Sequence, residues 1–81
     1  MKELIKFHAT WCGPCKSLSN IMKTIDVGMP VTECDIDDNM DQAAKYAVRG
    51  VPTVVLLEDG KEVKRFVGVK TADDIKEWLE N

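Results

Sequence analysis

The chain has 81 residues, a length that fits one domain over residues 1–81 and leaves no room for a second. Because hydrophobic residues make up 44% of it, the chain can bury an apolar core, which excludes an intrinsically disordered protein. The net charge is −3 with mixed signs, and the chain has neither a bilayer-length apolar run nor a signal-peptide core, so we expect a cytoplasmic monomer that binds neither nucleic acid nor membrane.

The first elements follow from a change of apolar spacing near residue 13. Residues 2–9 predict a strand because polar and apolar side chains alternate. One face of this strand would carry Leu4, Lys6 and His8. From Gly13 the spacing becomes helical, and Pro14 suits a first helical turn because its missing N–H is not needed there. This helix is expected to continue until Gly28 and Pro30 end it.

The middle of the chain predicts a short strand and a short helix. Residues 31–36 predict the strand, and Asp38 or Asn39 can cap a helix that runs through Val48. The expected apolar face of this helix consists of Met40, Ala43, Ala44 and Ala47.

The last third of the chain predicts a hairpin and a final helix. Residues 53–57 and 62–67 predict two strands, and Asp59-Gly60 between them is a strong hairpin signal. Thr71 is expected to cap the helix that follows. The buried face of that helix would consist of Ile75, Trp78 and Leu79.

The predicted element order is β-α-β-α-β-β-α, which indicates an α/β fold. A helix joins the first two strands, so they should be parallel with a right-handed crossover. The hairpin adds two antiparallel strands. We therefore expect a four-stranded mixed sheet flanked by three helices.

Two of the three cysteines form a C-x-x-C motif, Cys12 and Cys15. An odd cysteine count without a secretion signal does not suit a structural disulfide framework, whereas C-x-x-C in a βαβ context suits a redox pair. Cys12 lies where the first strand meets the first helix, and unpaired N–H groups at a helix start stabilise a thiolate. We therefore expect Cys12 to be the nucleophile and Cys15, one turn further and more buried, to resolve the mixed disulfide. This reaction needs no metal and no organic cofactor.

Other interpretations of the cysteines remain open at this point. C-x-x-C is also half of a zinc site, which Cys34 and His8 could complete. The pair could also be purely structural. Cys34 suits a small buried strand residue, with a regulatory thiol as the alternative.

Several segments together resemble the thioredoxin family, and they cover nearly the whole chain. The segment FHATWCGPCK at 7–16 is similar to the thioredoxin active site, and YAVRGVPT at 46–53 is similar to the segment with the family's cis-proline. DGK at 59–61 and FVG at 66–68 match in order and spacing.

The resemblance implies a docking surface for substrates around the cysteines. Pro52 would be cis and lie against them, and Val51 would offer its backbone N–H and C=O to an extended substrate segment. The flat apolar surface beside them would be formed by Trp11, Gly13, Pro14 and Gly68. The alternative for Pro52 is an ordinary loop proline.

The chain also departs from the thioredoxin pattern. The family's first strand and helix are missing, which leaves the strand at 31–36 as an exposed edge. Thioredoxins usually carry a buried Asp at the position of Lys6 and a Lys at that of Glu33, so the charges are exchanged here. We expect Lys6 and Glu33 to pair beneath the cysteines as a proton relay, with Glu33 as acceptor; a Lys6 that snorkels to solvent is the alternative. His8 replaces an aromatic residue and either packs or tunes Cys12.

The resemblance implies a reductant of protein disulfides, recharged by a flavin- or ferredoxin-linked thioredoxin reductase. A glutaredoxin-like enzyme that uses glutathione suits the short chain, but the motif lacks the usual Pro-Tyr between the cysteines. A docking module without redox turnover is the third possibility.

Overall fold

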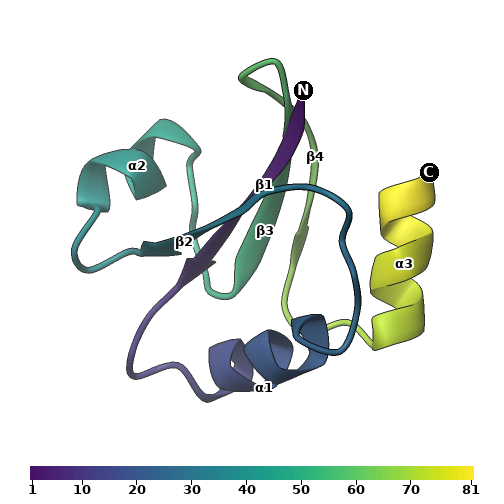
Figure 1. The fold of residues 1–81 in the computed structure, drawn as a ribbon. Coiled ribbons are helices and arrows are strands. Elements are labelled where there is room, and N and C mark those ends of the chain that lie inside the picture. The colour runs from purple at the N-terminus through teal and green to yellow at the C-terminus, as the bar shows by residue number, and fades with distance from the viewer.

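The computed structural model describes residues 1–81 and contains one four-stranded sheet and three helices, as the sequence predicts (Figure 1). The order of strands in the sheet is β2-β1-β3-β4. In chain order the elements are β1 (Lys2–His8), α1 (Gly13–Met22), β2 (Val31–Asp35), α2 (Met40–Lys45), β3 (Thr53–Glu58), β4 (Lys61–Val67) and α3 (Ala72–Glu80). None of these helices has the length and apolar character that a membrane crossing needs.

The strand pairing is also as predicted. β1 and β2 are parallel, and their register places Lys6 beside Glu33. β3 pairs antiparallel with β1 and with β4. The turn between β3 and β4 contains Asp59 and Gly60, which both have positive φ angles of 53° and 84°. A two-residue turn of this kind matches the twist of the strands that it joins, which is why Asp-Gly is such a reliable signal.

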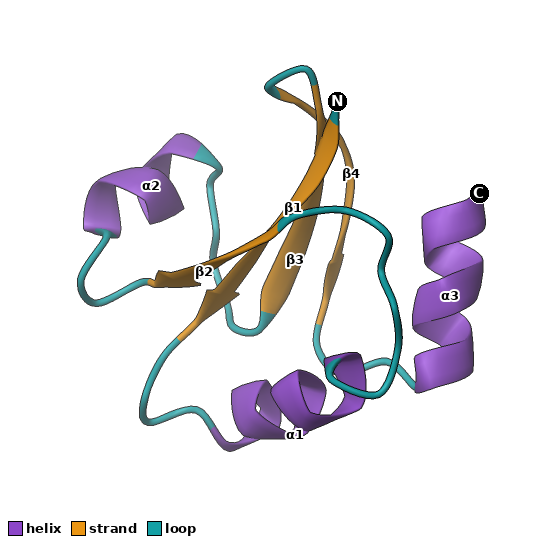
Figure 2. Ribbon diagram, in the orientation of Figure 1, coloured by secondary structure: helices purple, strands orange, loops and turns teal.

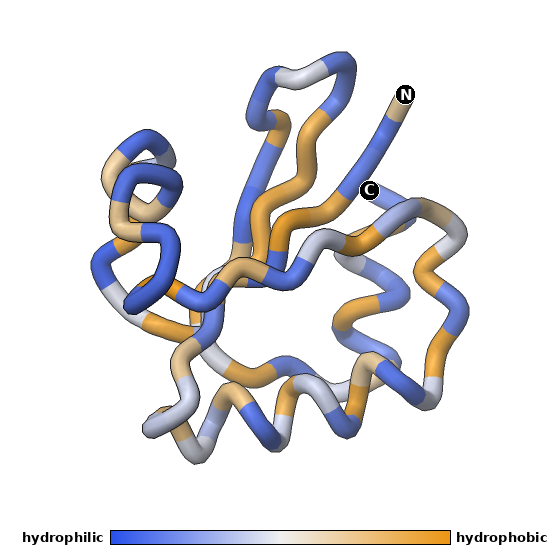
Figure 3. Tube along the Cα trace, turned by 60° about the vertical axis from the view of Figure 1, so that its left-hand side comes forward, coloured by the Kyte–Doolittle hydropathy of each residue, from blue (hydrophilic) through white to orange (hydrophobic).

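The sheet separates two apolar cores, because neighbouring strand residues point to opposite faces. Helices α1 and α3 lie on one side and α2 lies on the other (Figure 2). The first core consists of Leu4, Leu18, Met22, Val54, Leu56, Phe66 and Ile75. The second consists of Phe7, Cys34, Val55 and Leu57. β3 contributes to both cores, and its apolar run is visible as a continuous orange stretch in Figure 3.

Helix α1 is shorter than predicted, since it ends at Met22 and not near Gly28. The backbone N–H and the hydroxyl of Thr24 both donate to the Ile21 carbonyl, at 3.0 and 2.6 Å. Such side-chain bonds compete with the helical pattern. The apolar periodicity misled the prediction because the segment after the helix still packs its apolar side chains, Ile25, Val27 and Met29, against the first core.

Helix α2 also differs from the prediction, because it ends at Lys45 and not at Val48. Ala47 has a positive φ of 52°, and the Val48 N–H closes the turn on the Ala43 carbonyl at 2.8 Å. The expected apolar face was wrong, since Met40 is 73% exposed. The contact with the sheet is made by residues at and after the end of the helix, Tyr46 and Val48.

β2 is an edge strand, as expected, and its first three residues are exposed. The cap of α3 is also confirmed, because Thr71 Oγ1 accepts a hydrogen bond from the Asp74 N–H at 3.1 Å. Ile75 of α3 is fully buried in the first core, with Trp78 and Leu79 partly buried beside it.

Candidate active site

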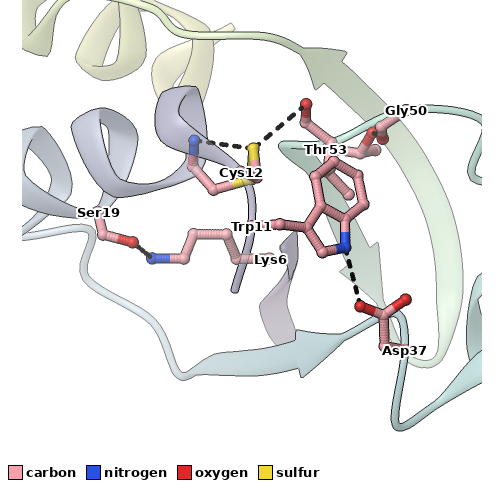
Figure 4. The surroundings of a disulfide bond; sticks show 9 residues. Lys6, Trp11, Cys12, Ser19, Asp37, Gly50 and Thr53 are labelled. Carbon is pink, nitrogen blue, oxygen red and sulfur yellow. Dashed lines mark hydrogen bonds between the residues drawn. A yellow bond between two sulfur atoms is a disulfide. The ribbon is translucent and has the colours of Figure 1, made fainter. Parts of the chain in front are cut away.

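Cys12 and Cys15 form a disulfide at the start of α1, with their Cα atoms 5.3 Å apart (Figure 4). Cys12 is the N-cap residue of the helix and has an extended backbone. The Cys15 N–H donates to Cys12 Sγ at 3.1 Å. The Cys12 sulfur therefore occupies the place where a capping side chain accepts a helix N–H, and a negative charge is favoured there.

The first turn of α1 contains no acidic side chain that would offset the positive end of the helix. Pro14 lies within this turn without an N–H of its own. The positive end of the helix and the Cys15 N–H thus both act on Cys12. The hydrogen bond from the Cys15 N–H is thus consistent with the stabilised Cys12 thiolate that the sequence predicts.

The two cysteines are buried to the same extent, since 4% of Cys12 and 3% of Cys15 are exposed. This difference lies in the expected direction, but it is too small to distinguish the two residues by burial. In the disulfide, both sulfurs are held in one small cluster with Ala9, against Ile36 and Val51. What distinguishes the cysteines is their neighbours, because Cys12 faces Val51 and Cys15 lines a groove along α1.

The bond between Val51 and Pro52 is cis, and this segment lies directly against the disulfide, as the resemblance implies. The Val51 carbonyl oxygen is 3.8 Å from Cys12 Sγ. The Gly68 N–H donates to the Pro52 carbonyl at 2.9 Å, and Thr53 Oγ1 donates to the Gly50 carbonyl at 2.7 Å. These bonds hold the segment, while the Val51 N–H has no hydrogen-bond acceptor within the chain.

The residues expected on the docking surface do lie around the disulfide. Trp11, Gly13 and Pro14 are exposed, and Gly68 is half-buried. The Trp11 Nε1–H donates to Asp37 Oδ2 at 2.9 Å (Figure 4). This contact of Asp37 was not predicted, because nothing in the spacing of the residues links the loop after β2 to the tryptophan.

Lys6 and Glu33 form an ion pair, with 3.0 Å between Lys6 Nζ and Glu33 Oε1. Lys6 is only 5% exposed, so the snorkelling alternative is wrong. Lys6 Nζ also donates to Ser19 Oγ of α1 at 2.6 Å. This contact of Ser19 was not predicted, although its position one helical turn after Cys15 places it on the same face of α1.

His8 and Cys34 lie on opposite faces of the sheet, so they do not complete a zinc site with the cysteine pair. Cys34 is buried in the second core beside Phe7, whereas half-buried His8 lines the groove near Cys15. No group of three or more potential ligands is close enough to hold a metal ion. Burial raises the pKa of the Cys34 thiol, and the nearby Asp35 carboxylate adds to this effect. Cys34 is thus a small buried strand residue.

Comparisons with known proteins agree with this geometry. The family model for thioredoxin matches residues 1–81. Thioredoxin from Chlamydia trachomatis is 41% identical over 75 residues, which cover 89% of this chain and 74% of that protein. Thioredoxin from Staphylococcus epidermidis is 34% identical over 82 residues, which cover 96% and 79%.

The solved structures show the same relationship. A mutant thioredoxin from Halobacterium salinarum superposes with a TM-score of 0.89 at 40% identity, over 98% of this chain and 72% of that one. The thioredoxin of Fasciola hepatica superposes with a TM-score of 0.86 at 33% identity, over 98% and 78%. The fold is therefore shared, while this chain spans only part of the length of these proteins.

Proposed function

Since this chain belongs to the thioredoxin family of dithiol–disulfide oxidoreductases, we propose that Cys12 is its attacking thiolate and Cys15 its resolving thiol. The observation that carries this assignment is the 3.1 Å hydrogen bond from the Cys15 N–H to Cys12 Sγ at the start of α1. The helix start stabilises negative charge on the sulfur that forms the first bond to a substrate.

The reaction is a pair of thiol–disulfide exchanges that moves two electrons. The Cys12 thiolate attacks one sulfur of a substrate disulfide, a mixed disulfide forms, and the other substrate sulfur leaves as a thiolate. The Cys15 thiolate then attacks Cys12 Sγ and releases the second substrate sulfur. The substrate gains two electrons, and the two protons that the cysteine thiols release reach its sulfurs through water. The protein ends as the Cys12–Cys15 disulfide.

We further propose that an extended substrate segment pairs with the backbone of Val51. The Val51 N–H is free, and its carbonyl oxygen is 3.8 Å from Cys12 Sγ. Backbone pairing at this position brings a substrate disulfide to Cys12 whatever its side chains are. The apolar surface for the substrate would be formed by Trp11, Gly13, Pro14 and Gly68, with the buried Pro52 behind it. This explains how one site can serve many disulfide-containing proteins.

A reductant must be recharged, and we propose that a flavin- or ferredoxin-linked thioredoxin reductase supplies the electrons. Membership of the thioredoxin family implies that the substrates are proteins with disulfides. A thioredoxin reductase is the electron donor that suits the Gly-Pro dipeptide between the two cysteines. Because this donor works in a reducing compartment, the proposal places the protein in the cytoplasm.

Trapping tests the roles of the cysteines. Cys15→Ser should accumulate a mixed disulfide with insulin through Cys12, since the resolving step is blocked. Cys12→Ser should accumulate at least tenfold less, and circular dichroism should show both variants folded. A larger yield of mixed disulfide from Cys12→Ser would overturn the assignment.

Insulin reduction with different donors tests the recharging partner. Turnover with NADPH and a flavin-linked reductase, or with a ferredoxin-linked one, should exceed turnover with glutathione at least tenfold. Faster turnover with glutathione would replace this proposal with a glutaredoxin-like function.

A further inference from the structure

A buried lysine lies beneath the helix that carries the disulfide. Lys6 is 5% exposed, which is unusual because an ammonium group loses much solvation energy when it is buried. Its Nζ has two partners, Ser19 Oγ at 2.6 Å and Glu33 Oε1 at 3.0 Å. Figure 4 shows the Lys6 side chain extended toward α1, where it ends at Ser19. The chain thus maintains a positive charge against the underside of this helix.

Ser19 connects this charge with the surroundings of Cys15. The two residues are one helical turn apart and share a helix face. Both line a groove of about 310 Å³ along α1. Ser19 also lines a second groove of about 310 Å³, which contains Lys6 and Glu33. The Ser19 hydroxyl accepts from Lys6 and donates no hydrogen bond in the disulfide form.

The position of Glu33 does not suit a proton acceptor for Cys15. Its side chain is 55% exposed on the edge strand, and its carboxylate is paired with Lys6. Lys6 is the residue that contacts α1, and no carboxylate lines the groove at Cys15. The arrangement presents a cation to the cysteine pair, with the carboxylate on the far side of that cation.

We propose that Lys6 acts as a fixed positive charge that stabilises the Cys15 thiolate and thereby favours the dithiol form of the protein over the disulfide. Ser19 is a positioning residue, because it holds the ammonium group against α1, and Glu33 is the counter-charge that weakens the effect of the ammonium on Cys15. In this role Lys6 transfers neither a proton nor an electron. This inference rests on the proposed function, in which Cys15 must act as a thiolate.

The other charged groups around the site are few. His8 of β1 and Lys16 and Lys23 of α1 line the groove at Cys15, and Lys23 also lines the groove at Lys6. From β3, the residue beside Lys6 is the apolar Val54. Lys23 is exposed, so it provides a matched control: a lysine near both grooves whose charge is screened by solvent.

The test is the equilibrium between disulfide and dithiol in mixtures of oxidised and reduced dithiothreitol, with no protein substrate. Lys6→Met should shift the equilibrium constant toward the disulfide by about tenfold, which corresponds to about 30 mV. Ser19→Ala should shift it about threefold in the same direction. Lys23→Met should shift it less than twofold, and Lys6→Arg, which retains the charge, should stay near the parent value.

Glu33→Gln separates a fixed charge from a proton relay. A fixed cation that loses its counter-charge should move the equilibrium toward the dithiol, whereas a relay would slow resolution at neutral pH and leave the equilibrium unchanged. An unchanged equilibrium in Lys6→Met, or equal shifts in Lys6→Met and Lys23→Met, would overturn the inference. These equilibrium measurements need no turnover of a substrate. The inference about Lys6 can therefore fail while the trapping experiment confirms the roles of the cysteines, and the reverse also holds.

Discussion

The local electrostatics of each sulfur distinguish the three cysteines, because their exposure does not: all three are almost fully buried. Cys12 and Cys15 lie at a helix start, beside a surface groove and an exposed tryptophan. Cys34 lies in the second core with Phe7 and Val55, where burial raises the pKa of its thiol. A thiolate is the reactive form, so the raised pKa makes the Cys34 thiol less reactive than an exposed one.

The raised pKa of Cys34 predicts how stability depends on pH. In the disulfide form, Cys34 is the one free cysteine. Its folded-state pKa lies above the unfolded value of about 8.5, so its contribution to stability is complete below that pH and is lost as the pH rises through the folded-state pKa. The free energy of unfolding should therefore fall more steeply above about pH 8.5 in the parent than in Cys34→Ala, as urea titrations at several pH values can measure. Parallel curves would contradict this prediction.

At the scale of elements, the reliable predictions are those that depend on local chemistry. The hairpin turn and the cap of α3 need only the residues that form them, and both are present. The ends of α1 and α2 were both placed too late, because the segments after these helices also pack apolar side chains against the sheet. The C-terminal end of α3 has partners outside the helix, because Lys64 of β4 donates to the carbonyls of Trp78 and Asn81.

The cap of α3 can be tested by a single substitution. Thr71→Ala removes the hydroxyl oxygen that accepts the Asp74 N–H, so one helix donor loses its partner. The free energy of unfolding should fall by about 1 kcal/mol, as is typical for an N-cap. Thr71→Ser keeps an acceptor and should remain within about 0.5 kcal/mol of the parent in urea unfolding. Equal losses in the two variants would mean that the threonine methyl group matters and the cap does not.

At the scale of the whole molecule, one face of the sheet packs against α1, which carries the cysteines, and the other face packs against the second core. Leu18 lies on the buried face of α1 and anchors the helix to the first core. The position of the cysteines relative to the cis-proline segment therefore depends on packing against side chains of β3, β4 and α3, which are distant in sequence. In a chain of 81 residues the core is small, so each of its side chains makes a large contribution.

Two apolar substitutions distinguish the core from the surface. Leu18→Ala should lower the free energy of unfolding by about 2–5 kcal/mol, because it removes a fully buried side chain and leaves a cavity. Met40→Ala should change it by less than about 0.5 kcal/mol, since Met40 is exposed. Urea unfolding of the two variants against the parent measures both values. A cost for Met40→Ala near that of Leu18→Ala would show that α2 packs more tightly than the structure indicates.

The sequence by itself determined the element order, the turns, the helix start at the cysteines and the nature of the chemistry. These features depend on residues close together in the chain, such as Cys12 to Cys15 or Asp59 and Gly60. The exchanged charges of Lys6 and Glu33 were also visible, because parallel pairing of two strands sets which residues are neighbours.

Only the tertiary structure decided what each of these residues contacts across the fold. It brought Lys6 to Ser19, Trp11 to Asp37 and the Val51 carbonyl to Cys12. It also buried both cysteines equally and left Met40 exposed. The physical reason is that burial and non-local hydrogen bonds depend on how the helices pack on the sheet. Local periodicity indicates only which side chains are apolar, and it does not indicate which surface of the fold they pack against.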